Sequence, residues 1–404
     1  MNKTILTIPT YWTWPAGEQG YPDDGIFDHP TPLDSEGTLG RTLESLKYLK
    51  SDSFEVLVIT ATVNSLLNDA VEKRVEELIT PYKKEYPITL FSHSDLLLVR
   101  KYLENKRIDP SLINLNEYAT IRNCQLIGSM LLGADLIAAI DDDEVVPEDF
   151  LFKANDYAGT IRHNKRIDGI GGVYLDKKGD YRVKEPYDAR TASNLFRKKL
   201  ALMNDEFARY MEYPDRIVES AIALGGNMIF TKELFMNVPF DPGITRGEDI
   251  DYLMNSRLFG YNWFFDRELS ITHLPPKPSD FQKVQISSYS KLQQDVIRFM
   301  YQREKLAHSQ HSPDLIPLNA EDFGYYPGAF LKDDLDMHAL IALTDLRPPG
   351  LSETFFPKAE ILIEKAKDRA GMVDDFFTFV TEWKKIMEVL SGSKELKEKM
   401  RSKL

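Results

Sequence analysis

The chain has 404 residues, which is enough for one large α/β domain with additions or for two domains. Its formal net charge of -13 argues against a nucleic-acid partner, and an anionic substrate would have to be held by local charges because the global field repels it. Cys124 is the only cysteine, which excludes an intramolecular disulfide and a cysteine-based zinc site and fits a cytoplasmic location.

Strand-like and helix-like patterns alternate over the first half of the chain, and this alternation indicates parallel βαβ units. Apolar, β-branched runs predict strands over residues 5–8, where Pro9 ends the run, and over 54–60, 88–91 and 136–140. Apolar residues at helical spacing predict helices over 38–49, 68–85 and 117–132.

The second half is more mixed, and its pattern changes after a proline-rich stretch near residue 276. Strands are predicted over 169–175, 228–230, 263–266 and 270–273, and helices over 195–210 and 251–259, the latter ending before Gly260. Beyond residue 276 we expect one long helix over 281–306 and one or two more over 360–404.

Membrane insertion is not expected, because no stretch approaches the ~20 apolar residues of a membrane span. The apolar run at the N-terminus is too short for a signal peptide. Any membrane contact would therefore be peripheral. The basic, amphipathic last ~20 residues fit a docking helix or a frayed tail. The sequence does not decide between a monomer and a homo-oligomer.

The first cluster of acids follows the predicted strand over 136–140 and comprises Asp141, Asp142, Asp143 and Glu144. Side chains alternate along an extended segment, so Asp141 and Asp143 can face the same way and chelate one hard divalent cation. The carboxyl end of a parallel strand is also where α/β sheets place their ligands. The alternative is a solvated turn before the next helix.

A second group of polar residues lies between residues 225 and 273. Gly225 and Gly226 allow close backbone approach to a ligand, and Glu248 and Asp249 open a predicted helix. The alternative for these acids is structural, because Thr245 and Glu248 have the spacing of a capping box. His273 would suit manganese if it joined carboxylate ligands, although a lone histidine is more often structural.

Taken in chain order, these elements resemble a GT-A-fold nucleotide-sugar glycosyltransferase similar to glycosyltransferase family 2. Ala119 to Asn123 resembles the Ala-Arg-Asn helix of that family, Asp141 to Asp143 its D-x-D motif, and Gly247 to Asp251 its xED motif. The resemblance covers residues 1–275 and implies a Rossmann-like mixed sheet flanked by helices. It divides them into a nucleotide-sugar half, 1–143, and an acceptor half, 144–275, followed by a mainly helical C-terminal region, 276–404.

The resemblance implies a role for each matching residue. Asp143 and His273 would bind a divalent metal, Mn²⁺ or Mg²⁺, and Asp249 would be the catalytic base with Glu248 beside it. Residues on the donor side would bind the nucleotide and its diphosphate: Pro9, Thr10, Tyr11, Arg122, Asp141 and Asp142. Residues on the other side would bind the acceptor, a carbohydrate or small hydroxyl compound: Gly225, Gly226, Asn227 and Asp251.

The resemblance implies transfer of a sugar from a UDP- or GDP-linked donor to an acceptor hydroxyl, with inversion favoured over retention. The segment 12–33 departs from the family pattern, and Thr60 and Ala61 stand where many members carry an aspartate for the base. Residues 274–280 could close over the donor, with Lys277 reaching a phosphate. Two alternatives stay open: a sugar nucleotidyltransferase and a non-catalytic carbohydrate-binding relative.

Overall fold

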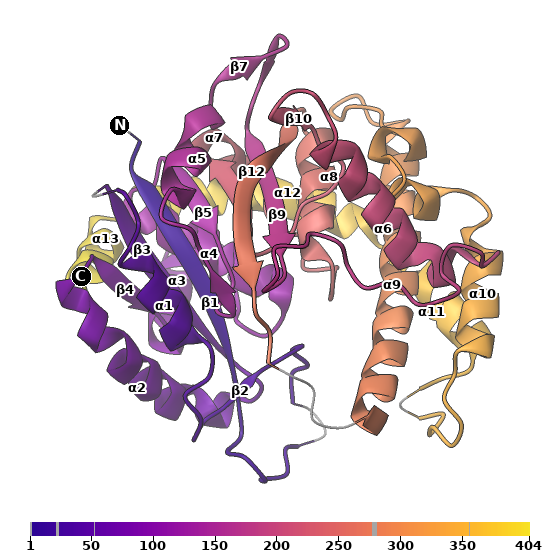
Figure 1. The fold of residues 1–404 in the computed structure, drawn as a ribbon. Helices are drawn as coiled ribbons and strands as arrows, with labels where there is room; N and C mark the ends of the chain where they lie inside the picture. The colour runs from indigo at the N-terminus through magenta and orange to yellow at the C-terminus, as the bar shows by residue number, and fades with distance from the viewer. Residues whose placement is uncertain (1, 22–23, 52, 277–280, 355) are drawn as a thin grey trace.

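The computed structural model describes residues 2–404 except 22–23, 52, 277–280 and 355, and gives the backbone alone for 281–287. Its main sheet has ten strands, of which eight follow the order β10-β12-β9-β11-β5-β1-β3-β4 (Figure 1). These eight are β1 (Thr4–Thr13), β3 (Phe54–Thr62), β4 (Ile88–Phe91), β5 (Leu136–Ala139), β9 (Gly169–Leu175), β10 (Ile217–Glu219), β11 (Met228–Thr231) and β12 (Trp263–His273). Two short strands extend the sheet, β2 (Thr31–Pro32) on β1 and β6 (Glu144–Val145) on β12, while β7 (Ile161–Arg162) and β8 (Lys165–Arg166) form a separate hairpin.

Helices cover both faces of the sheet, with α4 and α12 behind it and α1 in front of it in Figure 1. The α-helices of the first part of the chain are α1 (Leu39–Leu46), α2 (Asn68–Ile79), α3 (His93–Asn105), α4 (Tyr118–Leu132), α5 (Phe150–Tyr157), α6 (Leu195–Met211), α7 (Lys232–Asn237) and α8 (Glu248–Leu258). Those of the C-terminal region are α9 (Phe281–Ser309), α10 (Leu335–Asp345), α11 (Ala359–Ala370), α12 (Val373–Ser391) and α13 (Lys394–Arg401). The expected mixed α/β fold with a helical C-terminal extension is confirmed.

The direction of the strands brings distant segments to one edge of the sheet. β4, β3, β1 and β5 run parallel, β11 runs antiparallel to β5 and β9, and β9 and β12 are parallel to each other. The C-terminal ends of β1, β5, β9 and β12 therefore meet at the edge where β11 begins. This topology places the acids after β5, the glycines before β11 and His273 near one another.

The first strand was predicted to end at Pro9, and this prediction was wrong, because β1 continues to Thr13. The carbonyl of Thr7 accepts from the N–H of Ile140, so residues of the same parity in β1 turn their backbone groups toward β5. β5 pairs with β1 only as far as Thr7. The nitrogen of Pro9 therefore faces the side of β5, where β5 has already ended and no backbone N–H is needed for pairing.

Other elements differ from the prediction mainly at their ends. The predicted pieces 263–266 and 270–273 form one strand, β12, whose pairing with β9 is irregular between Phe265 and Ser270. The helix predicted over 251–259 begins at Glu248, in agreement with the expectation that Glu248 and Asp249 open it, and α3 was missed. Three helices, rather than one or two, follow residue 358. The predicted closure by residues 274–280 includes Lys277, which lies outside the described residues.

The C-terminal helices pack against the sheet part of the molecule. α12 crosses α4 and α7, and α13 contacts α4 and β4. Trp383 of α12 is fully buried, and its indole N–H donates to the carbonyl of Phe235 at 3.1 Å. Lys403 pairs with the buried Asp95 of α3 at 2.6 Å. Residues on both sides of position 276 thus share one hydrophobic core, while the proposed domain division stays a prediction.

Among the residues that the structure describes, no helix combines the length and the apolar character that crossing a bilayer demands.

Replacement of Trp383 tests whether the C-terminal helices stabilise the whole fold. Trp383→Ala would leave a large cavity and an unpaired carbonyl, so we expect the free energy of unfolding to fall by about 3–5 kcal/mol in one cooperative urea transition. Lys385→Ala, an exposed change on the same helix, is the control. A separate early transition that leaves the sheet folded would show instead that the C-terminal helices form an independent unit.

Candidate active site

The acidic turn after β5, residues 141–144, is hydrogen-bonded to the end of β12. β6 pairs with β12 so that Glu144 lies opposite His273, and the backbone N–H of Leu274 donates to the carbonyl of Asp143 at 2.9 Å. Arg41 donates to the carbonyls of Asp143 and Leu274. These backbone contacts bring Oδ2 of Asp143 to 3.3 Å from Nε2 of His273.

Asp143 and His273 offer one carboxylate and one imidazole, a donor set that suits Mn²⁺ and does not exclude Mg²⁺. Within the described part of the chain, no three or more His, Cys, Asp or Glu side chains are placed to hold an ion. The pair therefore fits a cation whose remaining ligands are phosphate oxygens and water. Although burial lowers the pKa of His273, its hydrogen bond to Asp143 and the charges of Asp143 and Asp141 raise it above the ordinary value.

Arg122 of α4 joins the two acidic segments. Its Nη2 lies 2.8 Å from Oδ1 of Asp141 and its Nε 3.4 Å from Oε1 of Glu248. The guanidinium is 4% exposed, so it must be balanced by carboxylates within contact distance. The structure therefore brings the predicted donor-side residues Arg122 and Asp141 together with Glu248 from the second cluster.

Glu248 and Asp249 are the first residues of α8, and the predicted capping box with Thr245 was wrong. The N-cap is Gly247, whose φ of 76° lies in the left-handed region that favours glycine. Oδ2 of Asp249 accepts from the backbone N–H of Gly225 at 3.1 Å, which links α8 to the loop before β11. Burial and the charge of Asp249, opposed by Arg122, raise the pKa of Glu248 to about 7.

The glycines before β11 lie against acids of the first cluster. A Cβ on Gly226 would lie 2.1 Å from Oε1 of the buried Glu144, and the N–H of Gly226 donates to the hydroxyl of Tyr174 at 2.6 Å. Asn227 is fully buried and donates from its amide to the carbonyls of Val173 and Leu269. The side chain of Asn227 thus holds β9 and β12, while Gly225 and Gly226 form the wall of the site.

The donor-side residues of β1 lie beside the acidic turn. The hydroxyl of Thr10 donates to Oδ2 of Asp142 at 2.6 Å. Burial and the charges of Asp143 and Asp141, opposed by Thr10, raise the pKa of Asp142 to about 7. Pro9 is buried within the sheet. The ring of Tyr11 packs against Phe27 and Tyr118, with centroid separations of 4.8 and 5.2 Å, so Phe27 brings the unassigned segment 12–33 to this point.

A cleft of about 650 Å³ opens beside these aromatic rings, over the C-terminal ends of β3 and β4. Its walls carry mostly neutral hydrogen-bonding side chains, together with the carboxyl group of Glu117 and the guanidinium of Arg100. Tyr118 borders the cleft, and one turn further along α4 Arg122 contacts Asp141. The cleft therefore leads to the acids without being lined by them. Its polar lining includes Thr60, Thr62, Asn64, Asn68, His93 and Asn114.

Asp251 is not brought into the acidic cluster. Its carboxylate is fully buried and accepts from Lys305 of α9 at 2.8 Å and from Gln302 at 3.1 Å. Lys305 is itself fully buried and also lies 2.6 Å from Asp241. Because Asp251 is on the helix that carries Asp249, this ion pair fixes α8 against α9.

Tyr174 and Arg41 are functional candidates that the sequence analysis missed. Tyr174 ends β9 with its ring 5.2 Å from that of His273, and Arg41 holds the acidic turn from α1. Neither residue stands in a recognisable motif. The sequence offered no signal for them, because the pairing of β9 with the strand that carries His273 was not predicted.

The raised pKa of Glu248 predicts how the free energy of unfolding depends on pH. A carboxyl whose pKa is about 7 in the folded state and 4.5 in the unfolded state binds more protons when folded between these values, so its contribution to stability falls as pH rises through this window. Gln resembles the protonated acid. We therefore expect Glu248→Gln to match the wild type near pH 4.5 and to exceed its unfolding free energy by up to about 3 kcal/mol above pH 7. Urea titrations of both proteins across this pH range test the prediction. A difference in unfolding free energy that is the same at all pH values would contradict it.

The contact between Gly226 and Glu144 gives a second prediction. Gly226→Ala would force Glu144 and the acidic turn to shift, lowering the free energy of unfolding by about 1–3 kcal/mol and weakening Mn²⁺ binding. Gly40→Ala is the matched control, because a Cβ there meets no described atom within 4 Å. Calorimetry of both variants with Mn²⁺ and UDP or GDP measures the difference; equal behaviour would show that the glycine is dispensable.

Comparisons with known proteins complete this description. No protein-family model and no curated protein matches the chain. Among solved structures, the chain is similar to the mannosyltransferase PcManGT from Pyrobaculum calidifontis in complex with GDP-Man and Mn²⁺, with 13% identity, 96% of this chain and 86% of that chain covered, and a TM-score of 0.44.

A second similar structure is TarS 1-349 from S. aureus in complex with UDP, with 12% identity, 99% of this chain and 91% of that chain covered, and a TM-score of 0.44. Because the identities and TM-scores are low, neither structure transfers a function to this chain. The function proposed for this chain therefore depends on the geometry of its own site.

Proposed function

We propose that the chain is a metal-dependent glycosyltransferase of the GT-A type, which moves a sugar from a UDP- or GDP-linked donor to an acceptor hydroxyl. The observation that carries this proposal is the arrangement around Arg122. A carboxylate and an imidazole suited to a cation, Asp143 and His273, lie on one side of the site, and the acid pair Glu248 and Asp249 lies on the other. Donor and acceptor chemistry would thus be served from two sides of one sheet edge.

On the donor side, a bound divalent cation would neutralise the charge that develops on the departing nucleoside diphosphate. Arg122 is placed to donate to a phosphate oxygen if one of its carboxylate partners gives way. The cleft over β3 and β4, which Tyr118 borders, would take the nucleotide base and ribose. Its side chains are largely neutral, so hydrogen bonds and stacking would dominate there.

On the acceptor side, Asp249 would take the proton of the acceptor hydroxyl as that oxygen bonds to the anomeric carbon. The bond from the anomeric carbon to the diphosphate breaks, and its electron pair leaves with the phosphate oxygen. Attack from the side opposite the leaving group inverts the anomeric centre, and inversion is the course we propose. Asp249 is half-buried and is oriented by the N–H of Gly225, which suits a base that must reach an open site.

Two competing functions have weaker support. A sugar nucleotidyltransferase would need cationic side chains for a triphosphate on the donor side, where Arg122 is already paired with two carboxylates. A non-catalytic carbohydrate-binding relative would not need the Asp143–His273 pair next to Glu248 and Asp249. A cytoplasmic location remains a prediction from the single, buried cysteine, and oligomeric state stays open.

A donor screen tests the proposed function. With Mn²⁺ and a panel of UDP- and GDP-sugars, we expect metal-dependent release of nucleoside diphosphate from one donor. Asp143→Asn should abolish this release by removing the anionic metal ligand, while Asp69→Asn, an exposed change on α2, should not affect it. A nucleotidyltransferase would instead consume added pyrophosphate and convert the nucleotide sugar into a nucleoside triphosphate and a sugar 1-phosphate. If neither turnover nor metal-dependent nucleotide binding is observed, the non-catalytic function is the better explanation.

In the same assay, Asp249→Asn tests whether Asp249 acts as the catalytic base or contributes to binding of the nucleotide and metal. We expect nucleotide and metal binding to be unchanged and transfer to fall by about 10²–10⁴-fold, the usual contribution of a general base. If transfer keeps its wild-type rate, Asp249 is not the base, and the retaining mechanism becomes the better explanation.

A further inference from the structure

Four cations gather beside the acid pair and share two carboxylates; we name them the basic cluster. They come from three separate parts of the chain: Lys199 from α6, Arg246 from the loop before α8, and Lys291 and Arg298 from α9. Lys199, Arg246 and Arg298 all pair with Asp295, the last at 2.7 Å. Arg246 and Lys291 also pair with Asp28 of the long N-terminal segment, at 3.6 and 3.1 Å.

The basic cluster lies directly against the start of α8. Nη1 of Arg298 fills the space in which Gly247 would carry a side chain, 1.6 Å from where its Cβ would be. Gly247 immediately precedes Glu248 and Asp249, and the charge of Asp249 acts on Arg298. The cations therefore border the same part of the site as the proposed base.

The basic cluster has more donors than the described acceptors use. The Nε–H groups of Arg246 and Arg298 are buried and have no hydrogen-bond acceptor among the described residues. Asp295 is nearly fully buried; burial raises its pKa, but Lys199, Arg298 and Arg246 outweigh this and lower it below the ordinary value. The four cations thus share only two paired carboxylates, Asp28 and Asp295, in a chain whose formal net charge is -13.

Three of the cations are open to solvent and could touch a ligand. The side chains of Lys199, Arg246 and Lys291 are 18%, 26% and 34% exposed. If the basic cluster served only to join α6, α8 and α9, a matching number of carboxylates would be expected.

We propose that the basic cluster binds an anionic group, a carboxylate or a phosphate, of the acceptor. The proposal rests on the proposed glycosyl transfer and adds the class of acceptor: a hydroxyl compound with an anion close to the hydroxyl that reacts. Lys199, Arg246 and Lys291 would hold the anion, and the hydroxyl would face Asp249. Charge-assisted hydrogen bonds would supply both affinity and orientation.

Matched acceptors test this inference once the donor is known. Glycerol, glycerate and glycerol 3-phosphate share a carbon skeleton, as do glucose, glucuronate and glucose 6-phosphate. We expect a charged member of one set to accept the sugar with a kcat/KM at least tenfold higher than that of its neutral counterpart. The carboxylate and phosphate arms identify which anion is preferred. A neutral member that equals or exceeds its charged counterparts overturns the inference.

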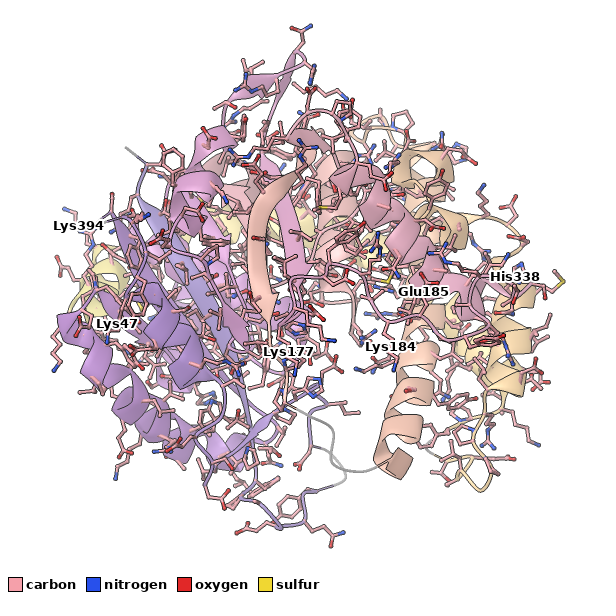
Figure 2. The ribbon with its side chains drawn as sticks, in the orientation of Figure 1. Lys47, Lys177, Lys184, Glu185, His338 and Lys394 are labelled. Carbon is pink, nitrogen blue, oxygen red and sulfur yellow. The ribbon has the colours of Figure 1, made fainter. Side chains whose placement is uncertain are left out.

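Variants of the basic cluster assign the effect to these residues. Lys291→Met and Lys199→Met keep the length of the side chain and remove its charge. Each should raise KM for the charged acceptor by roughly tenfold, the loss expected for one charge-assisted hydrogen bond, and should lower the preference over the neutral member. Lys394→Met is the control, because Lys394 is exposed and lies on the opposite side of the molecule in Figure 2. Equal KM values for all three variants would overturn the assignment.

Titration of the wild-type protein with inorganic phosphate, followed by calorimetry, gives a readout independent of transfer. We expect binding that is weakened in Lys291→Met and unchanged in Lys394→Met. If no member of either acceptor set is used and phosphate also fails to bind, the inference is wrong. Donor release with Mn²⁺ but no anion preference overturns this inference alone, whereas no release from any donor overturns the proposed function.

Discussion

The buried guanidinium of Arg122 is the constraint on which the site depends. A charge that is 4% exposed must be neutralised nearby, and it is neutralised by Asp141 from the turn after β5 and Glu248 from the start of α8. These two acids are more than 100 residues apart in the chain, so Arg122 joins the donor-side turn to the acceptor-side helix. Because both carboxylates contact the same guanidinium, a change on one side of the site alters the electrostatic environment of the other, and the two sides are expected to behave as one unit.

The C-terminal helices are part of this site rather than an addition to it. α9 contributes Lys305, whose buried pairs with Asp251 and Asp241 fix α8, and Arg298, which packs against Gly247. α12 and α13 then return across α4 to β4, and Trp383 closes the core behind the sheet. The helix that carries Asp249 is therefore positioned from both directions along the chain, by Gly225 before it and by Lys305 after it.

Sequence patterns predicted the features that depend on local order. The strand over 88–91 and the strand over 169–175 match β4 and β9, because apolar runs bounded by turn residues encode them directly. The family resemblance also assigned Asp143 and His273 to one metal site, and the structure places their side chains 3.3 Å apart. The errors involve partners distant in sequence. Pro9 is tolerated in β1 because β5 is short, and the N-cap of α8 is Gly247, where Arg298 occupies the space that a side chain would need. The basic cluster could not be predicted, since its cations converge only after α6 and α9 pack.

Electron paramagnetic resonance of bound Mn²⁺ tests the central claim most directly, that Asp143 and His273 hold a cation together with a nucleoside diphosphate. With Mn²⁺ and UDP or GDP added to the wild-type protein, the account predicts a nitrogen hyperfine coupling from the imidazole of His273 and its loss in His273→Ala. A spectrum that remains that of the fully hydrated ion, or a nitrogen coupling that persists in His273→Ala, would contradict it.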